Sequence, residues 1–215
     1  AALSKTGKLG SVSAFAIPEL ITSLNAFVLG AQRINPDIEL SIVWLNSWFD
    51  PAKAQEATQA LVAQNCDVIF SNAQDTPSVV AKSEELGVYS FNLNSSMKAY
   101  APNTYLGCVL TDWSPFFRAS IQAHLGGNFE GANAFLSVGD DVVKVVDWSA
   151  DIPEDVMAQI MEVEAAIADG SFAPFTGPII KADGTEGVAA GVTLTDAEVI
   201  SLDWHVKGVT TPLPG

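Results

Sequence analysis

The sequence contains none of the short motifs that mark common nucleotide-binding and hydrolytic sites. It has no GxGxxG or Walker loop, no GxSxG nucleophile elbow and no HExxH metal motif. Histidine occurs only at His124 and His205, and both are isolated in sequence, which favours structural roles over catalysis. The sequence therefore predicts no catalytic residue, no metal site and no cofactor, and it favours a binding role over an enzymatic one.

Cysteine is almost as scarce. Cys66 and Cys108 are the only two in 215 residues, and neither belongs to a CxxC pair or has a metal-type spacing to histidine. Lone cysteines in a chain of this size are more often buried small hydrophobic residues than disulfide partners, but the sequence leaves their redox state open. They do not identify a cellular compartment.

Basic residues and long hydrophobic runs are also few. The sequence has ten basic and 25 acidic residues, and most of the excess of acidic residues lies late in the chain. Residues 1–126 hold 10 acids and 7 bases, whereas residues 127–215 hold 15 acids and 3 bases. Such an acidic surface repels phosphate backbones, which argues against nucleic-acid binding.

No apolar stretch approaches the roughly 18 residues of a membrane span. A hydrophobic content of 48% is nevertheless ample for a core.

Apolar runs and X-Pro sites alternate along the first part of the chain. The runs are LGSVSAF (9–15), LSIVWL (40–45), DVIFSN (67–72), VYSFNL (88–93) and YLGCVL (105–110). The X-Pro sites, each opening a helix-period pattern, are AIPELI (16–21), FDPAKA (49–54), DTPSVV (75–80), WSPFFR (113–118) and DIPEDV (151–156). Proline is favoured at the first helical position, and Asp50, Thr76 and Ser114 just before it fit a capping role. Apolar runs separated by helices indicate parallel strands covered on both faces, so the predicted fold class is α/β with a Rossmann-like sheet.

Right-handed crossovers place the exits of all parallel strands along one edge of the sheet, which is where ligands bind in open α/β sheets. Candidate ligand-binding residues at or just past these exits are Trp48, Asp75, Asn94 and Trp113. Structural alternatives stay open for most of them. Asp75 fits a cap or turn and Asn94 is a common turn former, while Trp113 can brace the helix that follows it.

The composition and periodicity of the sequence change after residue 125. GGNFEGANAF (126–135) is a glycine-rich joint, and LSVGDDVVKVVDW (136–148) alternates like a strand or hairpin. Residues 151–170 predict an acidic amphipathic helix, and the remainder predicts turns, short β pieces and a last short helix. The sequence thus divides into an α/β part, residues 1–126, and an acidic part, residues 127–215.

Several segments carry a family resemblance. They are residues 43–70, which include SWFDPAK, then NAQDTPSVV (72–80), GVYSFNLNSSM (87–97), APNTYL (101–106), TDWSPFF (111–117), GSFAPFTGPI (170–179), LTDAEVISLDWHVKGV (194–209) and PLPG (212–215). Together they resemble the basic membrane protein (BMP) family of bacterial ABC-transporter substrate-binding lipoproteins. The SWFDPAK block is the most specific part, and the resemblance covers essentially the whole chain.

The resemblance implies a type I periplasmic binding-protein fold, in which two α/β lobes close on a purine nucleoside or nucleobase. Residues 1–126 would be the C-terminal lobe, and residues 127–215 the hinge-crossing and tail segments. The N-terminal lobe, with one wall of the cleft, would be largely missing from this chain. The implied partners are a small purine and ABC permease subunits, in a periplasmic or extracytoplasmic location. The protein would associate with a membrane only through a lipid anchor on the missing N-terminus.

The resemblance also implies roles at the edge of the sheet. An aromatic at the position of Trp48 stacks on the purine in nucleoside-binding members, whereas Phe49, its neighbour, is expected to face the core. Nucleoside binders carry an acid and a lysine that serve the ribose, and the matching positions here read Asn94, Ser96 and Thr111. This difference favours a bare nucleobase such as adenine, whose edges Gln74 and Asp75 would read.

Two other functions are compatible with the sequence. The ligand-sensing domain of a transcriptional repressor shares the fold, although the SWFDPAK block favours transport. A nucleoside hydrolase would need acids clustered at one strand exit to hold a metal ion. Asp50, Asp75 and Asp112 instead lie in three separate predicted loops.

Overall fold

A six-stranded sheet forms the centre of the computed structural model, which describes residues 1–72, 76–131 and 133–214. Its strands are β1 (Lys8–Ser13), β2 (Glu39–Trp44), β3 (Val68–Asn72), β4 (Tyr89–Asn94), β5 (Tyr105–Thr111) and β6 (Val143–Val146). They lie in the order β2-β1-β3-β4-β5-β6. The first five run parallel and β6 is antiparallel to β5. The predicted α/β class with a parallel sheet is confirmed.

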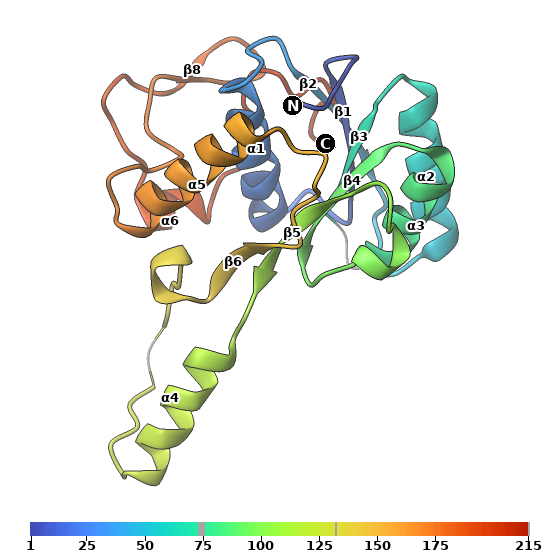
Figure 1. Ribbon diagram of the computed structural model, residues 1–215. Coiled ribbons are helices and arrows are strands. Elements are labelled where there is room, and N and C mark those ends of the chain that lie inside the picture. The colour runs from blue at the N-terminus through green and yellow to red at the C-terminus, as the bar shows by residue number, and fades with distance from the viewer. Residues whose placement is uncertain (73–75, 132, 215) are drawn as a thin grey trace.

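Helices cover both faces of the sheet (Figure 1). The helices in the described part of the chain are α1 (Pro18–Gln32), α2 (Pro51–Ala63), α3 (Thr76–Leu86), α4 (Ser114–Leu125), α5 (Glu154–Ala168) and the short α6 (Asp196–Val199), with 3-10 turns η1 (Lys98–Tyr100) and η2 (Val138–Asp140); α4 does not cover the sheet. The five longer helices begin at the predicted X-Pro sites. Helices α2 and α3 lie together on one face, and α1 lies on the other.

Alternation of side chains along the strands builds a core on each face. On the α1 face, Leu40, Ile42 and Phe70 pack with Leu24 and Val28 of α1. Tail residues complete this face; they include Phe175, Ile179, Val188, Leu202, Val206 and Val209. On the other face, Val12 and Ile69 pack against Leu61 of α2 and Val79 of α3. The tail is therefore an integral cover of the sheet.

The tail adds to the edge of the sheet as well as to its face. The short strands β7 (Ile179–Ile180) and β8 (Glu186–Val188) pair with each other. Farther on, the backbone N–H of Leu40 donates to the carbonyl of Gly208, and that of Thr210 donates back to Leu40. These bonds engage the outer edge of β2, which would otherwise present unpaired backbone groups.

Two of the predicted local features can be compared with the structure. The Asp50 side chain accepts from the backbone N–H of Lys53 at 3.1 Å, so its predicted capping role is confirmed. The capping role predicted for Ser114 is wrong: Ser114 is already inside α4, and its own backbone N–H donates to Asp112 at 3.0 Å. Cys66 and Cys108 are both free and buried.

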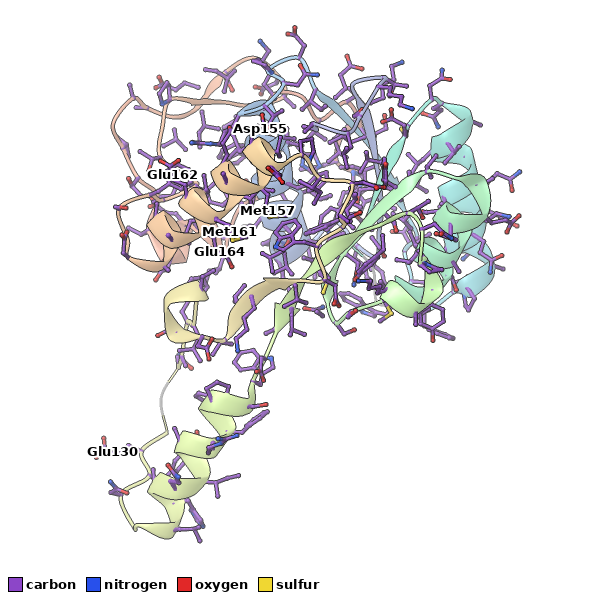
Figure 2. All side chains as sticks on the ribbon, viewed as in Figure 1. Glu130, Asp155, Met157, Met161, Glu162 and Glu164 are labelled. Carbon is purple, nitrogen blue, oxygen red and sulfur yellow. The ribbon has the colours of Figure 1, made fainter. Side chains whose placement is uncertain are left out.

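Helix α4 and the residues that follow it extend away from the body of the molecule as an arm, residues 114–131 (Figure 1). None of the residues of α4 is buried, and Phe117, Ile121 and Leu125 are exposed at four-residue intervals. Figure 2 shows Glu130 near the tip of this arm, and Asp155, Glu162 and Glu164 on α5. No helix in the described part of the chain is both long and apolar enough to cross a membrane.

Candidate functional site at the carboxyl edge of the sheet

The five parallel strands end at the same edge of the sheet. Their last residues are Ser13, Trp44, Asn72, Asn94 and Thr111. The register places Ser13 opposite both Trp44 and Asn72, and Asn94 opposite Leu110. Parallel sheets bind ligands outside this edge, where short loops lead into the helices. Of the predicted site residues, the described ones, Trp48, Asn94 and Trp113, lie at these strand ends or just past them.

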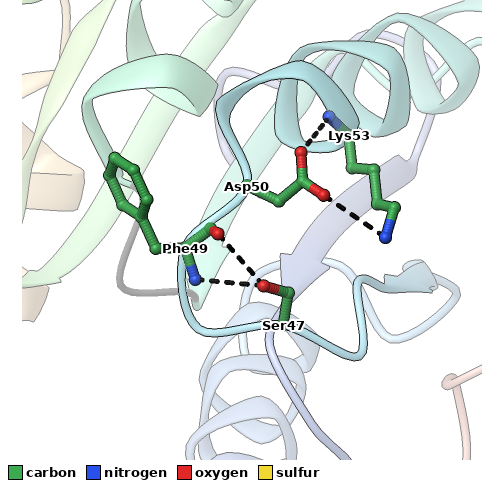
Figure 3. A network of polar contacts seen from close by, with 4 residues as sticks. All are labelled: Ser47, Phe49, Asp50 and Lys53. Carbon is green, nitrogen blue, oxygen red and sulfur yellow. Dashed lines mark hydrogen bonds and ion pairs between the residues drawn. The ribbon is translucent and has the colours of Figure 1, made fainter.

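The loop that carries Trp48 is fixed by short polar contacts (Figure 3). Asn46 opens it with a positive φ of 51°, a conformation that asparagine tolerates better than most residues. The Ser47 hydroxyl accepts from the N–H of Phe49 at 3.2 Å and donates to the Phe49 carbonyl at 3.1 Å. Asp50 then caps α2. Its hydrogen bond from the Lys53 N–H lowers the pKa of its carboxyl.

The Trp48 side chain is half-exposed at this edge. The residue is 44% exposed, so Trp48 is not an ordinary core residue. It contacts Phe15, which follows β1, with ring centroids 4.9 Å apart and planes 59° apart. Sequence reasoning missed Phe15, although it lies just past β1 as Trp48 lies just past β2. The structure thus places an aromatic pair at the exits of two adjacent strands.

The orientation predicted for Phe49 is wrong. Its side chain is 72% exposed and does not face the core. The prediction extended strand alternation to residues 48 and 49, whereas β2 ends at Trp44 and the Ser47 turn intervenes. Both aromatics are therefore accessible, and among the described residues Trp48, unlike Phe49, has an aromatic ring partner.

Asn94 and Thr111 are brought together as the last residues of neighbouring strands. The Thr111 hydroxyl donates to the Asn94 side-chain oxygen at 3.3 Å, and Asn94 has a positive φ of 73°. Both side chains are accessible in this part of the edge. The turn-forming role that the sequence allows for Asn94 matches this backbone conformation, and its hydrogen-bonding side chain is accessible at the edge.

A charged pair that sequence reasoning missed lies next to Thr111. Oδ2 of Asp112 is 3.5 Å from Nζ of Lys144 on β6, and Asp141 Oδ1 is 3.1 Å from the same ammonium. Asp112 also accepts from the Ser114 N–H. Hydrogen bonds from the side chain and the backbone of Ser114 foremost, and then the nearby Lys144, lower the pKa of Asp112, and Asp141 foremost raises that of Lys144. The antiparallel pairing of β5 with β6 brings Lys144 to Asp112.

Trp113 lies at the start of the arm, and its ring contacts belong to its own helix. Its centroid is 6.0 Å from that of Phe116 and 6.5 Å from that of Phe117. Three strands separate β2, which leads to Trp48, from β5, which leads to Trp113, a span of about 19 Å at the usual strand spacing. The structure therefore does not bring the two tryptophans together within this chain.

Gln74 and Asp75, predicted to read base edges, lie outside the described residues. An open hollow of about 390 Å³ is present elsewhere, lined by Lys181, Trp204, His205 and residues 209–213 among others. Of the predicted site residues, the described ones, Trp48, Asn94 and Trp113, do not line it. Asp50 and Asp112 belong to the exits of β2 and β5, so these two acids do not form one cluster.

These features define an α/β lobe whose parallel sheet has, at its carboxyl edge, the kind of site where such sheets bind ligands. Comparison with known proteins assigns its family. Residues 1–172 match the family of PnrA-like ABC transporter substrate-binding proteins (Bmp). The chain belongs to this family, which confirms the resemblance seen in the sequence. Its members are substrate-binding proteins of transporters rather than enzymes, and they act outside the cytoplasm.

Individual relatives agree with this assignment. A purine-binding protein of Brucella abortus (strain 2308) is 35% identical over 214 residues, all of this chain and 61% of the relative. A putative ABC transporter glucose-binding protein of Haloferax volcanii, TsgA13, is 31% identical over 86% of this chain and 47% of its own length. A transcriptional activator of comK from Bacillus halodurans has a TM-score of 0.72 at 23% identity, over 81% of this chain and 60% of its own, and shows the fold alone. The chain thus spans about half to three fifths of these proteins.

Proposed function

We propose that the chain captures a purine, with a bare nucleobase such as adenine as its ligand, as part of the substrate-binding component of an ABC importer. The observation that carries this proposal is the half-exposed Trp48, which is held by Phe15 at the carboxyl edge. A flat, polarisable ring in this position offers a stacking surface for a base. Such contacts contribute about 1 to 3 kcal/mol per base in other proteins.

The polar groups of the edge support a small ligand with hydrogen-bonding edges. Asn94 and Thr111 supply an amide and a hydroxyl at the ends of β4 and β5. Gln74 and Asp75 stay candidates to read the base, and Trp113 stays a candidate contact at the other end of the same edge. The relative that is named purine-binding supports this ligand class for the chain.

A nucleoside is the second candidate, and the pair of Asp112 and Lys144 favours it. A carboxylate and an ammonium can together accept from and donate to the hydroxyls of a ribose. In this structure, however, Lys144 is shared between two acids, and Asp112 is engaged by Ser114 and Lys144. We therefore place the bare base first. Family membership favours transport over the repressor and hydrolase alternatives.

The remaining parts of the proposal concern the longer protein. The chain spans 61% of the Brucella relative, and we propose that an N-terminal lobe supplies the second wall of the cleft, with a lipid anchor at its start. ABC permease subunits would then receive the ligand. If that lobe contributes even ~4 kcal/mol of contact, its loss weakens binding about a thousandfold. The 215 residues alone should therefore bind adenine weakly.

Fluorine NMR of the chain labelled with 5-fluorotryptophan tests the ligand class, because it detects weak binding at named residues. Titration with adenine should move the Trp48 resonance, identified by its loss in Trp48→Phe. Adenosine should act more weakly, and glucose, the ligand named for the Haloferax relative, should have no effect. A response to glucose but not to adenine would refute the proposal. Release of adenine from adenosine would instead support the alternative that the protein is a nucleoside hydrolase.

A further inference from the structure

We infer that Phe15 is a positioning residue for the ligand site, because it holds the Trp48 indole in the orientation that a planar ligand meets. This inference rests on the proposed function, and it assigns a role to a residue outside the predicted site. The ring centroids of Phe15 and Trp48 are 4.9 Å apart with planes 59° apart. At this separation and tilt the two rings are in contact, which is a favoured arrangement for an aromatic pair.

The backbone of Phe15 is fixed by its neighbours. The N–H of Ala14 donates to the carbonyl of Asn72 at 3.3 Å, and the N–H of Ile17 donates to the carbonyl of Phe15 at 3.0 Å. The buried amide of Asn72 also donates to Leu20 of α1 at 3.1 Å. The turn that presents Phe15 is thus held between the end of β3 and the first turn of α1.

The backbone beside Trp48 is equally constrained, by Ser47 on one side and the Asp50 cap on the other (Figure 3). Its indole is half-exposed, and Phe15 is its ring partner among the described residues. Both backbones are therefore fixed, and the ring contact fixes the side chain. An indole without this partner would sample other rotamers, which a ligand would have to restrict on binding.

Loss of the Phe15 ring should weaken binding through this ordering cost rather than through a lost ligand contact. Restricting one side chain corresponds to a change in affinity of about threefold to tenfold. Phe15→Leu should therefore raise the adenine dissociation constant by that factor. Phe15→Tyr, which keeps the ring, should bind as the wild type does.

The same 5-fluorotryptophan experiment separates positioning from direct contact. In ligand-free Phe15→Leu we expect the Trp48 resonance to shift and broaden, while the resonances of Trp44, Trp148 and Trp204 stay in place. Phe15→Tyr should keep the wild-type spectrum. Phe49→Leu is the matched control, since it removes an exposed neighbouring ring, and it should leave Trp48 unchanged.

Two results would overturn the inference. One is an unchanged Trp48 resonance in Phe15→Leu, whatever the affinity. The other is a tenfold loss in Phe15→Tyr, which would indicate a direct steric contact with the ligand. If Phe15→Leu does not fold, Phe15→Met, which keeps an apolar side chain of similar length, replaces it. A wild-type chain that responds to glucose but not to adenine would instead refute the proposed function and leave the ligand-free comparison intact.

Discussion

The carboxylate of Asp112 lies 3.5 Å from the ammonium of Lys144, across the antiparallel pair of β5 and β6. Asp112 precedes the arm in the sequence and Lys144 follows it. Their ion pair therefore links the segments before and after the arm at the carboxyl edge of the sheet. Lys144 is also paired with Asp141, and Asp112 also accepts from the N–H of Ser114. Because each charge already has partners within the protein, a ribose would have to compete with them.

This relationship predicts that adenine binds more tightly than adenosine. A ribose placed near Asn94 and Thr111 would leave hydroxyl groups without full compensation for their lost water. An unpaired buried hydroxyl costs roughly 1 to 3 kcal/mol, which favours the free base by about tenfold or more. Competition between the two ligands, followed through the Trp48 fluorine resonance, measures the ratio.

Lys144→Met provides the control for this comparison. It removes the ammonium and should leave adenine affinity within about twofold, since exposed ion pairs contribute little and the base does not need one. Tighter binding of adenosine in the wild type, lost in Lys144→Met, would show that the pair serves a ribose and that the ligand is a nucleoside.

A second prediction concerns His205, which is 4% exposed and stacks on Trp44 at a centroid distance of 6.3 Å. Burial lowers the pKa of its imidazole from 6.5 to about 4. The unfolded chain therefore binds a proton that the folded chain excludes, and stability falls as the pH drops from 6.5 towards 4. The difference corresponds to about 3 kcal/mol.

Urea denaturation at several pH values between 4 and 7 measures this contribution. His205→Phe keeps a ring beside Trp44 and should flatten the decline in the free energy of unfolding. The exposed His124 on the arm is the matched position, and His124→Phe should keep the wild-type decline. Equal slopes for the wild type and His205→Phe would contradict the assignment.

A third prediction contrasts the core with the arm. Leu61 is completely buried between α2 and the sheet, whereas Leu125 at the end of α4 is 81% exposed. Leu61→Ala should lower the free energy of unfolding by about 2 to 5 kcal/mol. Leu125→Ala should change it by less than about 0.5 kcal/mol. A loss above 1 kcal/mol for Leu125→Ala in the isolated chain would show that the arm is covered in solution.

Much of the fold follows from local signals in the sequence. Each apolar run became a strand within one or two residues of its predicted bounds, and proline marked the start of each longer helix, because both signals depend only on neighbouring residues. The prediction for the side-chain direction of Phe49 is wrong because it, too, used only neighbouring residues. Alternation holds only inside a strand, and the bonds of Ser47 turn the chain before residue 49 is reached.

The site is less predictable because it depends on contacts between distant segments. Trp48 could be placed at the edge, since it follows a strand and precedes a capped helix. Lys144 could not be placed beside Asp112, because 32 residues separate them and the pairing of β6 is not encoded near either. Phe15 could have been found: it follows β1 as Trp48 follows β2, and the two strands are adjacent.

Stacking on Trp48 is the central claim, and titrating adenine into the wild type, Trp48→Ala and Phe49→Ala tests it most directly. The two aromatics are neighbours at the same edge, so each variant controls for the other. Trp48→Ala should abolish detectable binding or weaken it by about tenfold or more, in line with the contribution of one stacked base, whereas Phe49→Ala should change it by less than about threefold. Equal losses in the two variants, or a larger loss in Phe49→Ala, would contradict the assignment of Trp48 as the stacking surface.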